Sequence, residues 1–272
     1  MKQKNAILLV VFCLTVLTLH SQEKRGFSLG FEVGSEYVTG DLNPNWNVRQ
    51  DVGYNGYDYG STNGTGSSVN SEMSMGFIAI KPEFSFLNNM FSIASGLRYT
   101  RMNSVIDHSS SNESGYFFLR DNGTSSISEY YKAKKINEDI DYLGIPLEVT
   151  FLPLKYEYFD FYLRVGAEIN ARFNTSRNIQ FVNPDMKSYE AGIVRNVGIT
   201  SNPFYSSVYS SIGIRFGKGK ATKYNFEVLL PSNFLTKNNS SIIIPRYYSG
   251  VKLSIQFPLK NTTGAKSDNK QL

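Results

Sequence analysis

The sequence has a single cysteine, Cys13, together with two histidines and one tryptophan among its 272 residues. A lone cysteine cannot close a disulfide within the chain, and no Cys or His cluster has the spacing of a zinc site. There is also no H-E-x-x-H motif, no P-loop and no dinucleotide-binding glycine motif after a strand. These absences exclude the common cofactor and metal chemistries, and we expect no cofactor, no metal and no enzymatic activity.

Long apolar runs are equally scarce. The one at the N-terminus, Ala6–Leu19, is too short to span a bilayer comfortably. It follows the basic residues Lys2 and Lys4 and precedes Leu19-His20-Ser21, an acceptable cleavage site. This arrangement predicts a signal peptide over residues 1–21 that is removed on export.

A strong excess of charge is missing as well. The formal net charge is +5, from 28 basic and 23 acidic residues, and losing Lys2 and Lys4 leaves 26 − 23 = +3. So small a charge argues against nucleic acid as a partner. The composition instead has 14% aromatic residues and 22 glycines, with few apolar stripes at helical spacing, which favours β structure.

The clearest positive signal is the segment Phe159–Asn174. Every odd position in it is apolar, and every even position is polar or glycine. A period of two predicts a β-strand, because successive side chains of a strand point to opposite faces. The run exceeds the usual length of about 3–10 residues for a globular strand. A long strand with one apolar face and an Arg/Glu-bearing opposite face is typical of an outer-membrane barrel.

Similar alternation recurs along the chain and predicts eight strands in all. They are Phe27–Val38, Met75–Leu87, Met90–Met102, Asp139–Leu152, Phe159–Asn174, Phe204–Phe216, Lys223–Leu230 and Arg246–Leu259. Within the fourth strand we expect Pro146 to cause a bulge or a local break, because proline donates no ladder hydrogen bond. Tyr116–Arg120, between the third and fourth strands, is expected to form a short hairpin or to extend a strand.

The connections between these strands alternate long and short. The long ones are Thr39–Ser74, residues 103–138, Asn174–Pro203 and Pro231–Pro245. A membrane barrel sorts its loops in this way, with short periplasmic turns at one end and long extracellular loops at the other. The fold class predicted is therefore all-β, an eight-stranded antiparallel transmembrane β-barrel over residues 22–259. Both termini are then periplasmic, and residues 260–272 form a polar tail.

The charged residues of the strands predict the nature of the lumen. They share the polar face, and Arg101 is the main exception on the apolar face. An eight-stranded barrel is only wide enough for its own side chains, and buried charges there must be paired. We expect a charge network that plugs the lumen, with a proton or ion relay as the alternative. Its members are Glu32, Glu36, Lys81, Glu83, Arg98, Glu148, Arg164, Glu168, Arg172, Arg215, Glu227 and Lys252.

Three short motifs carry a resemblance to a known family. The segment Tyr142–Glu148, YLGIPLE, is similar to the Tyr-Leu-x-Ile-Pro-Leu motif of the PorT-like outer-membrane barrels of Bacteroidetes, and Phe161–Ala167 is similar to the strand that follows it. Tyr248–Phe257 resembles the C-terminal signal read by the outer-membrane assembly machinery. The resemblance implies an eight-stranded barrel in the outer membrane, inserted by that machinery and surrounded by lipid and lipopolysaccharide. Some relatives are linked to protein secretion or gliding, and most have no assigned activity.

The role expected is structural, or that of a binding platform with long extracellular loops. Aromatic residues in the first long connection are candidates for gripping a glycan or a partner protein, although packing within the loop explains them equally well. They are Trp46, Tyr54, Tyr57 and Tyr59. The alternatives are a component of a secretion or surface-assembly apparatus and a lipid-modifying enzyme. For the enzyme the candidate set is His108, Ser110 and Glu113, in a serine-rich loop.

Overall fold

A computed structural model describes residues 26–49, 69–87, 89–108, 116–120, 130–217 and 221–259. The predicted signal peptide and polar tail lie outside these residues. The strands are β1 (Gly26–Leu42), β2 (Val48–Arg49), β3 (Val69–Phe86), β4 (Phe91–Ser95), β5 (Leu97–His108), β6 (Phe117–Arg120), β7 (Tyr130–Lys155), β8 (Phe159–Phe181), β9 (Phe204–Phe216), β10 (Lys223–Phe234) and β11 (Ile243–Leu259). The helices are the short 3-10 turns η1 (Pro44–Trp46) and η2 (Pro184–Tyr189) and the α-helix α2 (Glu190–Val197). No helix in the described part of the chain is both long and apolar enough to cross a membrane.

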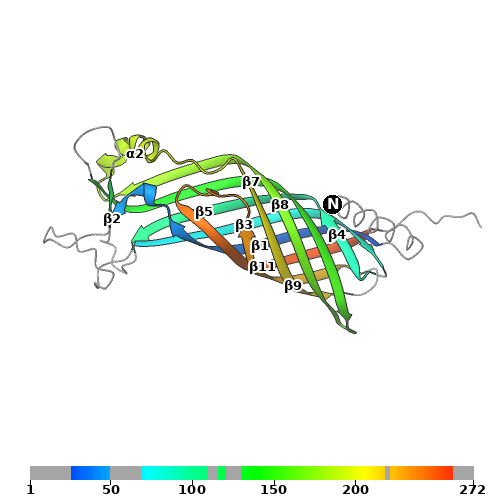
Figure 1. Ribbon diagram of the computed structural model, residues 1–272. Helices are drawn as coiled ribbons and strands as arrows, with labels where there is room; N and C mark the ends of the chain where they lie inside the picture. Colours follow the sequence, from blue (N-terminus) through cyan, green and yellow to red (C-terminus); the bar gives the residue numbers. More distant parts are fainter. Residues whose placement is uncertain are drawn as a thin grey trace, which may run out of the picture.

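The strands form one antiparallel sheet that closes into a barrel (Figure 1). From β1 the ring passes through β3 to β4 and β5, and both of these pair with β7. It continues through β8, β9 and β10 to β11, which pairs back onto β1 along most of its length. Closure gives the main strands partners on both sides over most of their length, which removes most of the exposed sheet edge.

The sheet has 11 strands, more than the eight predicted, because short pieces were not separated in the sequence pattern. The predicted strand Met90–Met102 is divided into β4 and β5 at Gly96. Its register with β3 is the same on both sides, Ala94 opposite Glu83 and Leu97 opposite Ile80, so the two pieces occupy one position in the barrel. A Cβ on Gly96 would lie 2.0 Å from the Ile80 carbonyl oxygen, so the close approach of the two backbones requires glycine here.

The prediction that β7 bulges or breaks at Pro146 itself is wrong. Pro146 pairs in register with Glu168, and the register shifts of β7 lie elsewhere, between Asp141 and Tyr142 and between Phe151 and Leu154. On its other side β7 meets β4 at Leu147 and β5 at Gly144, so Pro146 lies opposite the break between those two strands. The neighbouring strand is interrupted where Pro146 lacks an N–H, and β7 itself runs through.

Several strands extend further at the long-loop end than the alternation predicts. β7 begins at Tyr130 and β8 runs to Phe181, whereas the pattern predicts limits at Asp139 and Asn174. For Tyr116–Arg120, predicted to form a short hairpin or to extend a strand, the structure has the single strand β6, which pairs with both β7 and β2. The connections at the other end are the short ones, residues 87–90, 156–158 and 217–222. Long and short connections therefore alternate around the barrel.

The two faces of the wall are chemically opposite. Large apolar side chains project outward, for example Ile78 at 59% exposed, Ile145 at 62% and Ile169 at 67%. The inside has two layers: ionised side chains toward the short turns, and an apolar core toward the long loops. This apolar layer includes Met73, Met102, Ile136, Ile140 and Ile179, and the sequence analysis did not predict it.

Candidate functional site: the filled barrel interior

The structure places the predicted lumen residues on the inner wall. All of them except Arg172 are buried, and most have apolar outward neighbours on their strand. Glu148 illustrates the pattern: it is completely buried, whereas its neighbours Leu147 and Val149 are 57% and 40% exposed. The strict period of a strand turns one set of side chains inward and the other outward.

Glu148 lies at the centre of the ionic network. One carboxylate oxygen accepts from Lys81 Nζ at 2.6 Å, and the other accepts from the Tyr209 hydroxyl at 2.7 Å. Three more cations surround it, with Arg164 at 3.4 Å, Lys252 at 3.6 Å and Arg98 at 3.8 Å. A carboxylate shared in this way links four cations that come from four different strands.

The other carboxylates extend the network along the barrel. Glu32 accepts from Lys81 at 2.6 Å and from Arg98 at 3.0 Å, while Glu227 accepts from Arg164 at 2.6 Å. Further links join Arg98 to Glu168, Lys252 to Glu227, Arg164 to Glu32 and to Glu83, and Arg215 with Gln256 to Glu83. Such pairing and hydrogen bonding are what make buried charges tolerable.

Glu36 differs from the other carboxylates. It is buried, yet within the described residues it forms neither an ion pair nor a hydrogen bond, and its Oε1 atom has no partner. It lies where the charged layer gives way to the apolar one, since its register partner on β3 is Met75.

Tyrosines complete the charged layer, and the sequence analysis missed them. The Tyr162 ring lies over Gly213 of β9, where a Cβ would be 2.3 Å from the ring. The guanidinium groups of Arg164 and Arg215 are each 5.3 Å from the same ring, within cation–π range. The sequence does contain a sign of this packing, because tyrosines on the polar face of one strand lie opposite glycines on the neighbouring strand.

The long-loop end is closed by residues 239–242, which fold into the barrel mouth. Asn239, Ser240 and Ser241 are completely buried. Glu138 of β7 holds this segment: it accepts from Ser240 Oγ at 2.7 Å, from Ser241 Oγ at 2.7 Å and from the Ser241 backbone N–H at 2.8 Å. Arg177 donates to the same carboxylate at 2.7 Å. The segment is therefore a fixed cap on the interior.

Trp46 belongs to this cap and is not available for recognition. It is 1% exposed, packs in the apolar core, and donates from Nε1 to the Ser241 carbonyl at 2.9 Å. For this residue the structure favours loop packing, the other explanation given by the sequence. Tyr54, Tyr57 and Tyr59 lie outside the described residues.

The Glu138 interactions give a testable prediction. We expect Glu138→Gln to loosen the cap, because the neutral amide cannot form an ion pair with Arg177 and supplies one acceptor oxygen in place of two. Tryptic cleavage after the exposed Lys237, on the same connection, should become several-fold faster. Glu72→Gln on the outer face of β3 is the matched control. Equal cleavage rates in the two variants would contradict the role given to Glu138.

The other sequence candidates are only partly placed. Arg172 is half-buried at the long-loop end and donates to the Ser201 carbonyl and hydroxyl, so it does not join the charged layer. His108 ends β5 opposite Val69, while Ser110 and Glu113 lie outside the described residues. Within the described ranges no three His, Cys, Asp or Glu side chains are grouped so as to hold a metal ion.

Comparison with known proteins gives no family assignment, since no family model and no curated protein matches the chain. Among solved structures, the chain is similar to the outer membrane protein OprG from Pseudomonas aeruginosa, at 10% identity and a TM-score of 0.36, covering 87% of this chain and 98% of that one. It is also similar to Ail, the attachment invasion locus protein of Yersinia pestis, at 11% identity and a TM-score of 0.24, covering 86% and 97%. A FadL homologue of Pseudomonas aeruginosa has 12% identity and a TM-score of 0.28, covering 85% and 68%. Likeness at this level leaves function to be argued from the chain itself.

Proposed function

We propose that the protein is an outer-membrane β-barrel with a plugged lumen, which serves as a structural element or a binding platform at the cell surface. Counting β4 and β5 as one, eight strands surround the interior. The PorT-like family and a cleaved signal peptide are parts of this proposal that rest on the sequence motifs. The alternative is a component of a secretion or surface-assembly apparatus, and we infer no catalytic role.

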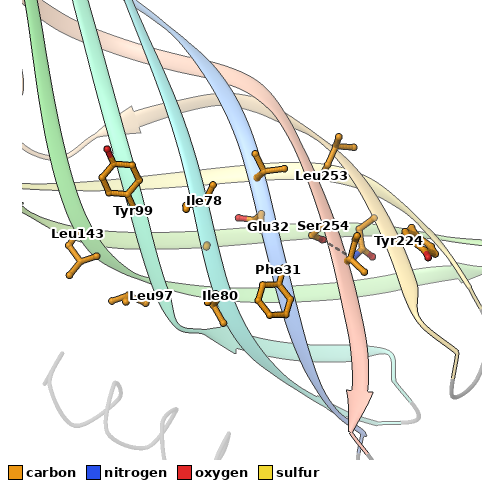
Figure 2. Close-up of a pocket in the computed structure, with 14 residues that line it drawn as sticks. Phe31, Glu32, Ile78, Ile80, Leu97, Tyr99, Leu143, Tyr224, Leu253 and Ser254 are labelled. Carbon is orange, nitrogen blue, oxygen red and sulfur yellow. Dashed lines mark hydrogen bonds between the residues drawn. The ribbon is translucent and has the colours of Figure 1, made fainter.

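The reversed polarity of the wall carries the proposal. A barrel in water would bury its apolar face, whereas here the apolar side chains face outward and the ions face inward. Figure 2 shows part of this outer face over β11, β1, β3 and β5, with Phe31, Ile80 and Leu97 projecting from the wall. Exposed apolar patches beyond a few hundred Å² are rare on soluble monomers. A bilayer turns the same surface into a favourable one.

A ring of polar side chains at the long-loop edge of the apolar band, here called the collar, also supports a barrel that lies in a bilayer. On the outer face of β5 and β7, Arg101 pairs with Asp139 at 3.3 Å, and the Tyr99 hydroxyl donates to Asp141 at 2.7 Å. Arg101, the main exception among the apolar faces predicted from the sequence, is thus at the level where lipid headgroups and water begin.

Cell fractionation and planar bilayers test the proposal. We expect the full chain to sediment with outer membranes, and the folded form to migrate differently from the boiled form in gel electrophoresis. Reconstituted in a planar bilayer, it should give no stable single-channel conductance, because paired side chains fill the charged layer and the cap covers the mouth. Recovery in the soluble fraction would contradict the membrane location, and a large stable conductance would contradict the plug.

A further inference from the structure

At the long-loop end one stretch of the wall lacks its neighbour. The pairing of β8 with β9 ends at Ala171 opposite Phe204, whereas β8 continues to Phe181 with β7 on its other side. The chain between β8 and β9 carries α2 beside this free edge (Figure 1). Between them lies a cleft of about 570 Å³, and its lining includes Arg172, Thr175 and Arg177 from β8 with Val194 and Thr200 from the α2 segment.

The cleft is rich in hydrogen-bond donors that are not in use. Arg172 donates to Ser201 only from its Nη1 group, and Arg177 donates to Glu138 only from its Nε group. Among the described residues, the remaining N–H groups of both guanidiniums have no partner. The Thr175 hydroxyl is a buried oxygen that likewise lacks one. The residues that line the cleft include two arginines and no carboxylate.

The backbone edge adds donors of the same kind. The Ile179 N–H donates at 2.6 Å to Oε1 of Glu190, so it points away from β7 and toward the α2 segment. Alternate residues of a strand turn their N–H groups to the same side, which places those of Thr175 and Arg177 toward the cleft. One end of this edge therefore already binds a carboxylate, that of Glu190, which also forms an ion pair with Lys187 at 2.6 Å.

We propose that the cleft binds a sugar-sized anion through a phosphate or carboxylate group held by Arg172 and Arg177. The planar guanidinium forks match either oxyanion, and the Thr175 hydroxyl and edge N–H groups supply further donors. The volume lies within the range of small-molecule sites. This inference rests on the proposed binding platform and names the class of ligand that it binds. The cleft is formed by the folded barrel itself, so a detergent-solubilised barrel retains it.

Calorimetric titration of the full chain in neutral detergent tests the proposal. The probes are glucose 6-phosphate, glucuronate and inorganic phosphate, with glucose as the uncharged comparison. We expect saturable binding of at least one sugar anion and none of glucose. Binding of glucose 6-phosphate alone would identify phosphate as the recognised group, and binding of glucuronate alone would identify carboxylate; either supports the proposal.

Variants connect the binding to the cleft. Arg172→Gln should weaken the affinity about tenfold or more, because hydrogen bonds to a charged group are lost. Arg246→Gln removes the same charge from the exposed surface of β11 and should leave the affinity unchanged. Thr175→Val keeps the shape of the side chain, removes the unpartnered hydroxyl and should weaken binding several-fold even if Arg172→Gln fails to fold. Absence of saturable anion binding, equal binding of glucose, or full affinity in folded Arg172→Gln would overturn the inference. Fractionation and conductance judge the membrane proposal separately.

Discussion

Replacing Glu148 by glutamine should destabilise the folded barrel by about 3–5 kcal/mol, the usual cost of removing one partner from a buried ionic group. Lys81, Arg164, Lys252 and Arg98 all lie within 3.8 Å of this carboxylate. The amide keeps the shape of the side chain and a hydrogen bond with Tyr209, so the loss reports the charge. The carboxylates of Glu32, Glu83, Glu168 and Glu227 cannot take its place at the centre, since each already has its own partners.

Urea unfolding of the protein in lipid vesicles measures this effect, followed by the gel shift between folded and boiled forms. Glu72→Gln, an exposed carboxylate on the outer face of β3, should change stability by less than about 0.5 kcal/mol. Adding Lys81→Gln to Glu148→Gln should cost less than the sum of the single changes, since the pair is in direct contact at 2.6 Å. A Glu148→Gln variant as stable as the Glu72→Gln control would mean that the charged layer contributes nothing to holding the barrel together.

Local alternation is the reason why the direction of side chains was predictable. In Phe159–Asn174 the period of two assigns each side chain to a face without knowledge of its neighbours, and Arg164 and Glu168 are indeed buried. The pairing of those charges was not predictable, because it depends on the shear of the barrel. Arg98 on β5, for instance, reaches Glu168 on β8 at 2.6 Å across the interior.

The parts that escaped prediction depend on contacts between distant residues. Trp46 stands in a polar stretch, and its burial follows from Ser241, which is 195 positions away. Arg172 was assigned to the lumen by parity, and it does share the inward face with its register partner Tyr142, but it lies at the long-loop end, where it bonds to Ser201 and not to the charged layer. The register of β7 and β8 shifts directly after it, so that Asp141 faces Asn174, and the faces of the residues beyond are exchanged. Nothing in the local pattern marks that position.

Val165→Arg is the second change with a large expected effect. Val165 is 58% exposed on the outer face of β8, near the middle of the apolar band. An arginine on the lipid face near mid-bilayer costs about 2–4 kcal/mol. We therefore expect a lower urea midpoint in vesicles and a smaller yield of the folded form.

The informative comparison is with the same substitution at Ser176, which is exposed on the outer face of the same strand, opposite Asp139 of the collar. If lipid covers the band, Ser176→Arg should be nearly neutral while Val165→Arg is costly, because the penalty depends on depth in the bilayer. If the wall faces water, both arginines are solvated and both changes stay within about 0.5 kcal/mol. Equal effects at the two positions would therefore remove the basis of the outer-membrane proposal and leave a barrel whose apolar surface needs another partner.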